Sequence, residues 1–216
     1  MIETNRIRDV LLRQKENLFA KKSLVTREIL KNILEFLNDK RIIIISGMRR
    51  VGKSTLLGEI MMQLKSQDKK YCYINFEDEA FLGFEAKDFE KLNEILMEVY
   101  GSGDYYFFDE VQNIENFESF IRRIQDDGKK IFLTGSNSSL LSKEFGTKLT
   151  GRYKLFELYP FSFKEFLVKN NMPLQADSKF TTEEKAQMKL FFANYIELGG
   201  VPEYLENKDT DYIRTI

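Results

Sequence analysis

A glycine-bounded loop between an apolar run and a predicted helix constrains this chain more than any other segment. Residues 41–46 read Arg-Ile-Ile-Ile-Ile-Ser, which is typical of a strand buried on both faces. Helical spacing follows from about residue 54 to residue 64. The loop matches G-x-x-x-x-G-K-[ST] and, with the residue after it, comprises Gly47, Met48, Arg49, Arg50, Val51, Gly52, Lys53, Ser54 and Thr55. Strand, loop and helix together predict a phosphate-binding loop.

Each invariant position of this loop has a chemical reason. Gly47 and Gly52 let the backbone approach a phosphate, so that successive N–H groups form an anion-binding nest at a helix N-terminus. Lys53 is expected to reach the β- and γ-phosphates of a nucleotide, and Ser54 to offer its hydroxyl to Mg²⁺. Thr55 is a weaker ligand candidate. The alternative is a glycine-rich turn with a solvated lysine, and the two arginines of the loop either approach phosphates or partner carboxylates, or face solvent.

Two carboxylates end another predicted strand. Residues 104–108 read Asp-Tyr-Tyr-Phe-Phe and run directly into Asp109 and Glu110. In an α/β sheet, ligands lie at the carboxyl ends of the strands, so Asp109 is expected beside the loop, in the Mg²⁺ shell. Glu110 is then the candidate that polarises an attacking water, since the chain has no histidine. The alternative is a solvated acidic turn.

Three polar residues and one arginine are further candidates. Ser136 and Asn137 are comparable candidates and Thr134 ranks slightly behind them; all three come at the end of a strand that should lie between the first and third strands. There they either bind the γ-phosphate or the attacking water, or cap the next helix. Arg152 either reaches the γ-phosphate of a neighbouring subunit as an arginine finger, or forms a structural ion pair.

The remaining pattern predicts an α/β domain. Further strands are expected at residues 71–76, 130–136 and 153–158, alternating with helices that include a short one at residues 138–145, which indicates a parallel sheet with crossover helices. Amphipathic helices are predicted before the sheet, at residues 4–20 and 26–38, with Thr26 as a cap. After Pro160 only helices are expected. The predicted divisions are 1–38, N-terminal helices packed on the core; 39–160, the core; and 161–216, a helical lid-like region.

Composition narrows the class of protein. The net charge of −1 gives no overall match to nucleic acid, and the basic stretches that contain Lys21, Lys22 and Arg27, or Arg122 and Arg123, are expected to be solvated helix faces. A single cysteine, Cys72, excludes an internal disulfide and is expected in the core. No apolar run reaches the ~18 residues needed to span a bilayer, and the N-terminus lacks a signal-peptide pattern. We therefore expect a cytoplasmic protein without a membrane partner.

Several motifs in fixed order identify a family resemblance. They are Gly-Met-Arg-Arg-Val-Gly-Lys-Ser-Thr (47–55), Phe-Phe-Asp-Glu-Val-Gln (107–112), Leu-Thr-Gly-Ser-Asn-Ser-Ser (133–139), Thr-Gly-Arg (150–152), Leu-Tyr-Pro-Phe-Ser-Phe-Lys-Glu-Phe (158–166) and Gly-Gly-Val-Pro-Glu (199–203). Together they resemble the prokaryotic AAA-type ATPases of the archaeal-ATPase-like group, relatives of the AAA+ and STAND NTPases. The resemblance spans about residues 20–205.

The resemblance implies a P-loop NTPase core, a three-layer sandwich with a parallel sheet of order 5-1-4-3-2. It implies a Walker A motif at 47–54, a Walker B motif at 105–110, a sensor at Ser136 or Asn137, and Arg152 as a finger or sensor. ATP and Mg²⁺ are the implied cofactors, with a homo-oligomer as one expected assembly. Full-length relatives continue into a winged-helix-like or nuclease-like domain, so the chain is expected to be a fragment or a shortened member.

Three functions stay open at this point. The chain is an ATPase that drives a conformational change in an attached domain or partner, an ATP-gated switch with negligible turnover, or a kinase of a small molecule. The pair Asp109-Glu110 favours a water nucleophile over kinase chemistry. DNA or protein partners are open as well, although net charge gives DNA no support.

Overall fold

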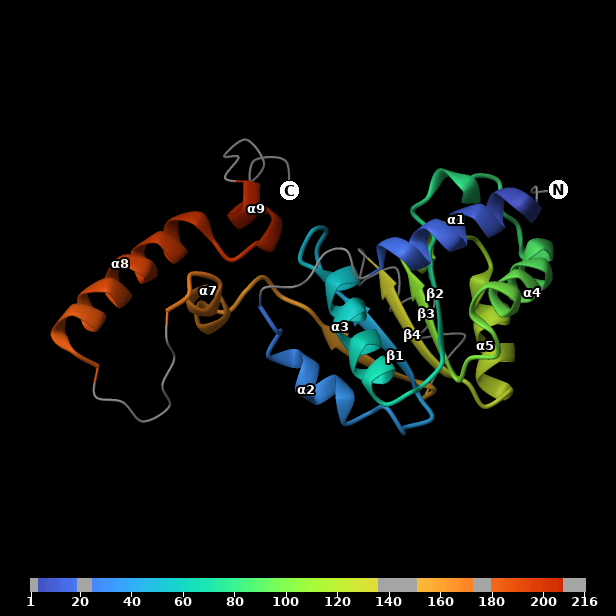
Figure 1. Ribbon diagram of the computed structural model, residues 1–216, viewed down its shortest axis with the longest axis horizontal. Helices are drawn as coiled ribbons and strands as arrows, with labels where there is room; N and C mark the ends of the chain where they lie inside the picture. Colours follow the sequence, from blue (N-terminus) through green and yellow to red (C-terminus); the bar gives the residue numbers. More distant parts are fainter. Residues whose placement is uncertain (1–3, 19–24, 136–150, 173–179, 208–216) are drawn as a thin grey trace.

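The computed structural model describes residues 4–18, 25–135, 151–172 and 180–207 and contains a five-stranded parallel sheet (Figure 1). The strand order is β2-β3-β4-β1-β5, which is the predicted order 5-1-4-3-2 in reverse. Both the fold class and the order are therefore confirmed. The strands are β1 (Ile42–Ser46), β2 (Tyr71–Asn75), β3 (Tyr105–Asp109), β4 (Lys130–Gly135) and β5 (Tyr153–Glu157).

Helices cover both faces of the sheet (Figure 1). The α-helices of the described residues are α1 (Thr4–Asn17), α2 (Ile29–Leu34), α3 (Lys53–Ser66), α4 (Phe89–Tyr100), α5 (Phe117–Asp126), α7 (Phe163–Lys169), α8 (Thr182–Leu198) and α9 (Pro202–Asn207). Short 3₁₀ turns are η1 (Glu79–Phe81), η2 (Ala86–Asp88) and η3 (Val111–Asn113).

The isoleucine run of β1 contributes side chains to two hydrophobic cores, because successive side chains of a strand point to opposite faces. Ile42 and Ile44 pack into the core that α1, α4 and α5 cover. Ile43 and Ile45 pack into the core beneath α2 and α3. All five residues of β1 are buried, as a central strand of a parallel sheet requires. The predicted core position of Cys72 is confirmed, and burial raises the pKa of its thiol to about 11.

The second N-terminal helix differs from its prediction. Helix α2 covers only Ile29–Leu34, and Glu28 occupies the N-cap without a side-chain cap hydrogen bond. The prediction of Thr26 as its cap is therefore wrong. Instead, the backbone N–H of Glu28 donates to Glu165 Oε1 at 2.7 Å, so a carboxylate from α7 caps this helix end. Residues 138–145, predicted as a short helix, lie outside the described residues.

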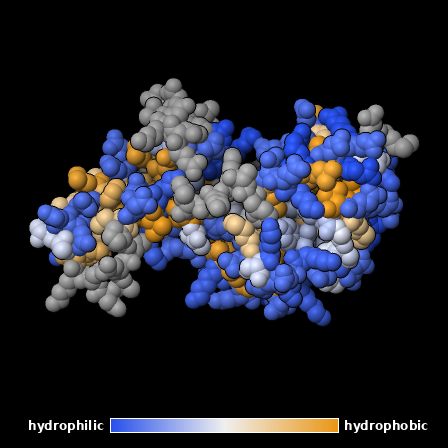
Figure 2. Space-filling view, viewed as in Figure 1, coloured by the Kyte–Doolittle hydropathy of each residue, from blue (hydrophilic) through white to orange (hydrophobic). Residues whose placement is uncertain are grey.

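A helical region follows the sheet. Helices α7 and α8 begin with capping boxes at Ser162 and Thr181, and they pack through Phe163, Phe166 and Tyr195. Helix α8 has no buried residue, and apolar surface gathers over this part of the molecule in Figure 2. Among the described helices, none combines the length and the apolar character that a membrane crossing requires.

Candidate nucleotide-binding site

The phosphate-binding loop leaves the sheet at the carboxyl end of β1, between β4 and β5. Both glycines of the loop occupy positions where a side chain would clash or strain the backbone. A Cβ on Gly47 would collide with the carbonyl oxygen of Leu158, and Gly52 has φ of 97° directly before α3 begins. Only glycine adopts these positions without strain. The loop therefore brings its backbone to the N-terminus of a 14-residue helix, as an anion site requires.

Lys53 folds back over this loop and joins it to the end of β3. Its side chain is only 3% exposed, and Nζ lies 3.3 Å from the Gly47 carbonyl oxygen and 3.2 Å from that of Met48. The same Nζ lies 3.3 Å from Glu110 Oε1. The structure thus brings together the lysine and the carboxylate that the sequence placed 57 positions apart.

Asp109 is the last residue of β3 and is fully buried. Tyr73 donates its hydroxyl hydrogen bond to Oδ2 at 3.1 Å, and Thr134 Oγ1 donates to Oδ1. Ser54 adds a further side-chain hydrogen bond. Burial raises the pKa of Asp109, and the three hydroxyl hydrogen bonds act in the opposite direction. Asp109 and Ser54, both predicted near Mg²⁺, are therefore neighbours.

Glu110 leaves the strand in a left-handed conformation, with φ of 51°. Its backbone N–H donates to Thr134 Oγ1 at 3.0 Å, and Gln112 Nε2 donates to its carboxylate. Its side chain is 14% exposed. The two carboxylates thus have different environments: Asp109 lies in the core among hydroxyls, and Glu110 lies beside Lys53 with access to solvent.

Thr134 and Tyr73 have larger roles than the sequence suggested. Thr134 was placed behind Ser136 and Asn137, yet its hydroxyl contacts both Asp109 and the backbone of Glu110. Ser136 and Asn137 lie outside the described residues. Tyr73 was not predicted; burial, then the charge of Asp109, raises its pKa. A polar residue near the end of a largely apolar strand was the signal available for Thr134, whereas Tyr73 lies in the middle of β2 and carried no such signal.

The two loop arginines contact carboxylates of this chain. Arg49 Nη2 lies 2.8 Å from Glu77 Oε1, and both side chains are largely exposed. Arg50 Nε lies 3.7 Å from Glu203 Oε2 in α9, which connects the loop to the helical region.

Arg152 lies at the opposite end of the strands from the phosphate-binding loop, where the strands begin. It directly precedes β5, whose first residue, Tyr153, pairs with Ile42 at the start of β1. The phosphate-binding loop follows the end of β1, roughly 15 Å away along the strand. Arg152 Nη1 instead lies 2.8 Å from Asp126 Oδ1. Within one chain, the structure does not bring Arg152 to the loop, and its action on a neighbouring subunit stays a prediction.

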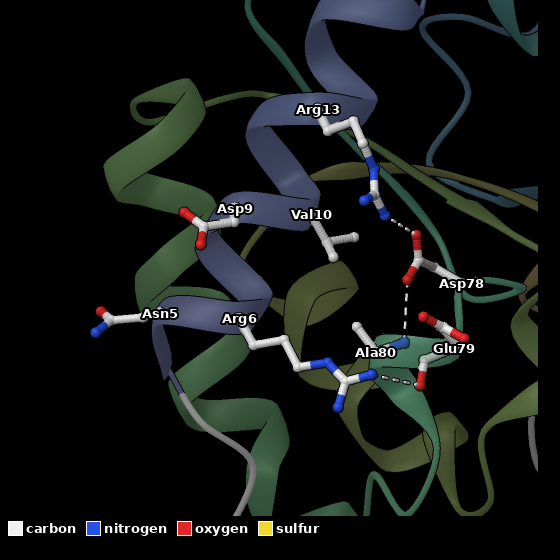
Figure 3. A pocket seen from close by; sticks show the side chains of 8 residues that line it. All are labelled: Asn5, Arg6, Asp9, Val10, Arg13, Asp78, Glu79 and Ala80. Atoms are coloured by element: carbon white, nitrogen blue, oxygen red, sulfur yellow. Dashed lines mark hydrogen bonds and ion pairs between the residues drawn. The ribbon is translucent and has the colours of Figure 1, made fainter.

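A separate cleft of about 310 Å³ lies between α1 and η1 (Figure 3). Two contacts cross it: Arg13 pairs with Asp78, and Arg6 donates to the backbone carbonyl oxygen of Glu79. No residue predicted for the nucleotide site lines it. The cleft is therefore distinct from the phosphate-binding loop.

Known proteins resemble this chain in sequence and in fold. It is 38% identical over 163 residues to an uncharacterised protein of Methanocaldococcus jannaschii, covering 76% of this chain and 36% of that protein. It is 33% identical over 187 residues to an uncharacterised protein of Haemophilus influenzae, covering 84% and 44% respectively. The chain thus spans less than half of the length of these curated relatives.

Solved structures share the fold at low identity. A cryo-EM reconstruction of Hsp104 with ATPγS and FITC-casein matches with a TM-score of 0.51 and 16% identity, over 75% of this chain and 31% of that chain. PCH-2 of C. elegans matches with a TM-score of 0.50 and 14% identity, over 96% and 63%. The sequence profile of the AAA domain matches residues 39–167, which contain the loop and both carboxylates. The chain therefore belongs to the AAA domain family of P-loop ATPases.

Proposed function

We propose that this chain binds ATP with Mg²⁺ and hydrolyses it, and that turnover drives a conformational change in an attached domain or partner. The observation that carries the proposal is the meeting of Lys53 and Glu110 at 3.3 Å across the phosphate-binding loop. A cation for the phosphates and a carboxylate for the attacking water then share one small volume.

Binding follows from the loop and from α3. Backbone N–H groups of the loop and the positive end of the helix attract the phosphates. Lys53 now contacts two loop carbonyl oxygens and Glu110, which are weak substitutes for a phosphate that carries several negative charges. A bound triphosphate therefore draws the lysine away from Glu110.

The residues around Asp109 fit a magnesium ion. Mg²⁺ prefers oxygen ligands and is commonly held by one or two carboxylates together with substrate phosphates and water. The Ser54 hydroxyl and the Asp109 carboxylate supply such oxygens, already in contact with each other. Thr134 and Tyr73 hold the carboxylate in one orientation. When bound, the ion neutralises charge that develops on the phosphates.

Glu110 is the residue that accepts a proton from water in this proposal. Release from Lys53 leaves its carboxylate free to orient a water molecule beside the γ-phosphate. Hydrogen bonds from Thr134 to its backbone and from Gln112 to its carboxylate hold it in place. The left-handed backbone turns its side chain away from the core position of Asp109 and toward the loop.

Contacts between the phosphate-binding loop and the helical region support the proposed coupling of ATP turnover to a conformational change. Arg50 faces Glu203 of α9, so a phosphate that attracts Arg50 would weaken that pair. Arg152 acts between subunits if the chain assembles as a homo-oligomer, since it lies far from the loop of its own chain.

Comparison of the wild type with Glu110→Gln tests hydrolysis against a switch without turnover. Phosphate release by the variant is expected to fall about 100- to 1000-fold, while affinity for a fluorescent ATP analogue changes little. Glu90→Gln, at an exposed pair with Arg123 on α5, is the matched control and should behave as wild type. Unchanged turnover in Glu110→Gln would show that the glutamate is not the base.

A further inference from the structure

Arg27 is a buried arginine that was expected on a solvated basic stretch, and that expectation is wrong. Its side chain is 6% exposed. Nη1 donates to the Val51 carbonyl oxygen at 2.9 Å, Nη2 to the Tyr159 carbonyl oxygen at 2.6 Å, and Nε to Glu165 Oε1 at 3.1 Å. All three nitrogens therefore have partners, as a buried guanidinium requires.

One of these partners belongs to the phosphate-binding loop. In a trans peptide the C=O and the following N–H point in opposite directions. By holding the Val51 carbonyl, Arg27 thus fixes the direction of the Gly52 N–H, which is one of the loop amides expected to face phosphate. Contact is close, because a Cβ on Gly52 would lie 3.6 Å from Nη1 of Arg27.

The other end of the contact is the start of α7. Glu165 is as buried as Arg27, and its Oε1 also accepts from the Glu28 N–H at 2.7 Å. Its Oε2 accepts from the Ser162 N–H at 2.9 Å, which closes the capping box of α7. A single carboxylate therefore fixes Arg27, the start of α2 and the start of α7.

The same contacts continue to the end of α8. The guanidinium of Arg27 lies 4.9 Å from the centroid of the Phe161 ring. The Phe161 N–H donates to the Gly200 carbonyl oxygen at 2.7 Å, and Tyr195 donates to the Phe161 carbonyl oxygen at 2.8 Å. A side chain on Gly200 would collide with Phe161, so this junction is tightly packed.

We propose that Arg27 is a positioning residue that couples occupancy of the phosphate-binding loop to α7 and the end of α8. The inference rests on the proposed function, because it requires a nucleotide at the loop. A phosphate that accepts from the Gly52 N–H pulls on the same peptide whose Val51 carbonyl Arg27 holds. The planar guanidinium fork passes this change to Glu165 and Phe161, because its three donors keep a fixed geometry.

Hydrogen exchange with and without a non-hydrolysable ATP analogue and Mg²⁺ tests the coupling. In the wild type, the analogue should change amide exchange in residues 162–170 and 195–200. Arg27→Lys keeps the charge but loses the fork, and Glu165→Gln keeps a residue suited to the capping box but loses the charge. Both variants should lose the exchange change in these segments and bind the analogue roughly 10-fold more weakly.

Arg41→Lys is the matched control, because Arg41 pairs with Asp39 near the opposite edge of the sheet and should leave both readouts unchanged. If Arg27→Lys does not fold, Glu165→Gln decides alone. An exchange change that persists in a folded variant overturns the proposal, even when the variant is less stable. Wild type that binds the analogue without any exchange change in α7 overturns this inference alone. Wild type that binds no nucleotide overturns the proposed function as well.

Discussion

The parallel strands all end at one side of the sheet, the carboxyl edge, and all begin at the opposite side, the amino edge. The two edges carry the same kinds of charged residues in different environments. At the carboxyl edge, the side chains of Lys53 and Glu110 are 3% and 14% exposed. At the amino edge, those of Arg152 and Asp126 are 49% and 65% exposed. The second pair has the shorter separation, 2.8 Å against 3.3 Å. The distance between two charged groups therefore does not by itself distinguish a functional site from a structural ion pair. Burial of the pair and the presence of further polar groups around it do.

Chain geometry explains this difference. At the carboxyl edge, the loop after β1 turns back into an α-helix, and β3 and β4 end beside it with polar residues. Polar groups there converge, and Lys53, Asp109 and Thr134 are buried. At the amino edge, Arg152 and Asp126 project into solvent, where water screens their attraction. Exposed pairs of this kind contribute about 0–1 kcal/mol to stability.

Replacement of the buried lysine should produce the largest effect. Lys53→Ala removes the cation of the loop and leaves Glu110 without its partner. We expect ATP affinity to fall by roughly 100-fold or more, because the bound phosphates lose the lysine as their partner. Truncating one member of a buried charge pair costs about 2–5 kcal/mol. Titration with a fluorescent ATP analogue measures this. Lys91→Ala, an exposed lysine of α4, is the control. Equal affinities of the two variants would remove the distinction between the edges.

Thr134 tests whether the hydroxyls at the carboxyl edge position the carboxylates. Thr134→Val keeps the shape but removes one of the three hydroxyl partners of Asp109 and the acceptor of the Glu110 N–H. We expect the free energy of unfolding to fall by about 1–3 kcal/mol, because buried polar groups are left unsatisfied. Urea denaturation measures the change. Thr134→Ser retains the hydroxyl and should recover most of the stability; equal losses in both variants would contradict a hydroxyl role.

Arg152 should show the smallest effect within one chain. Arg152→Ala removes an exposed pair, so stability should change by no more than about 1 kcal/mol and ATP affinity should not change. Phosphate release measured against protein concentration then tests action between subunits. A steep rise in wild type that Arg152→Ala abolishes supports a finger, and equal, concentration-independent turnover in both proteins contradicts one.

Local patterns in the sequence predicted most of the fold. The isoleucine run, the glycine loop and the alternation of strands with helices each depend on neighbouring residues, and the strand order followed from the family resemblance. Arg27 depends instead on Glu165, 138 positions away, and the start of α2 is capped by the same distant carboxylate. Such partners are set by tertiary packing. The positions of Lys53 and Asp109 were predictable because the strand ends of a parallel sheet share one edge.

A crystal structure of this chain with a non-hydrolysable ATP analogue and Mg²⁺ tests the central claim most directly. We expect phosphates against the loop amides and Lys53, with its Nζ moved away from Glu110 Oε1, and Mg²⁺ beside Ser54 and Asp109. A structure in which Lys53 keeps its contacts with Glu110 and the Gly47 carbonyl oxygen, while the analogue binds elsewhere, would contradict the account.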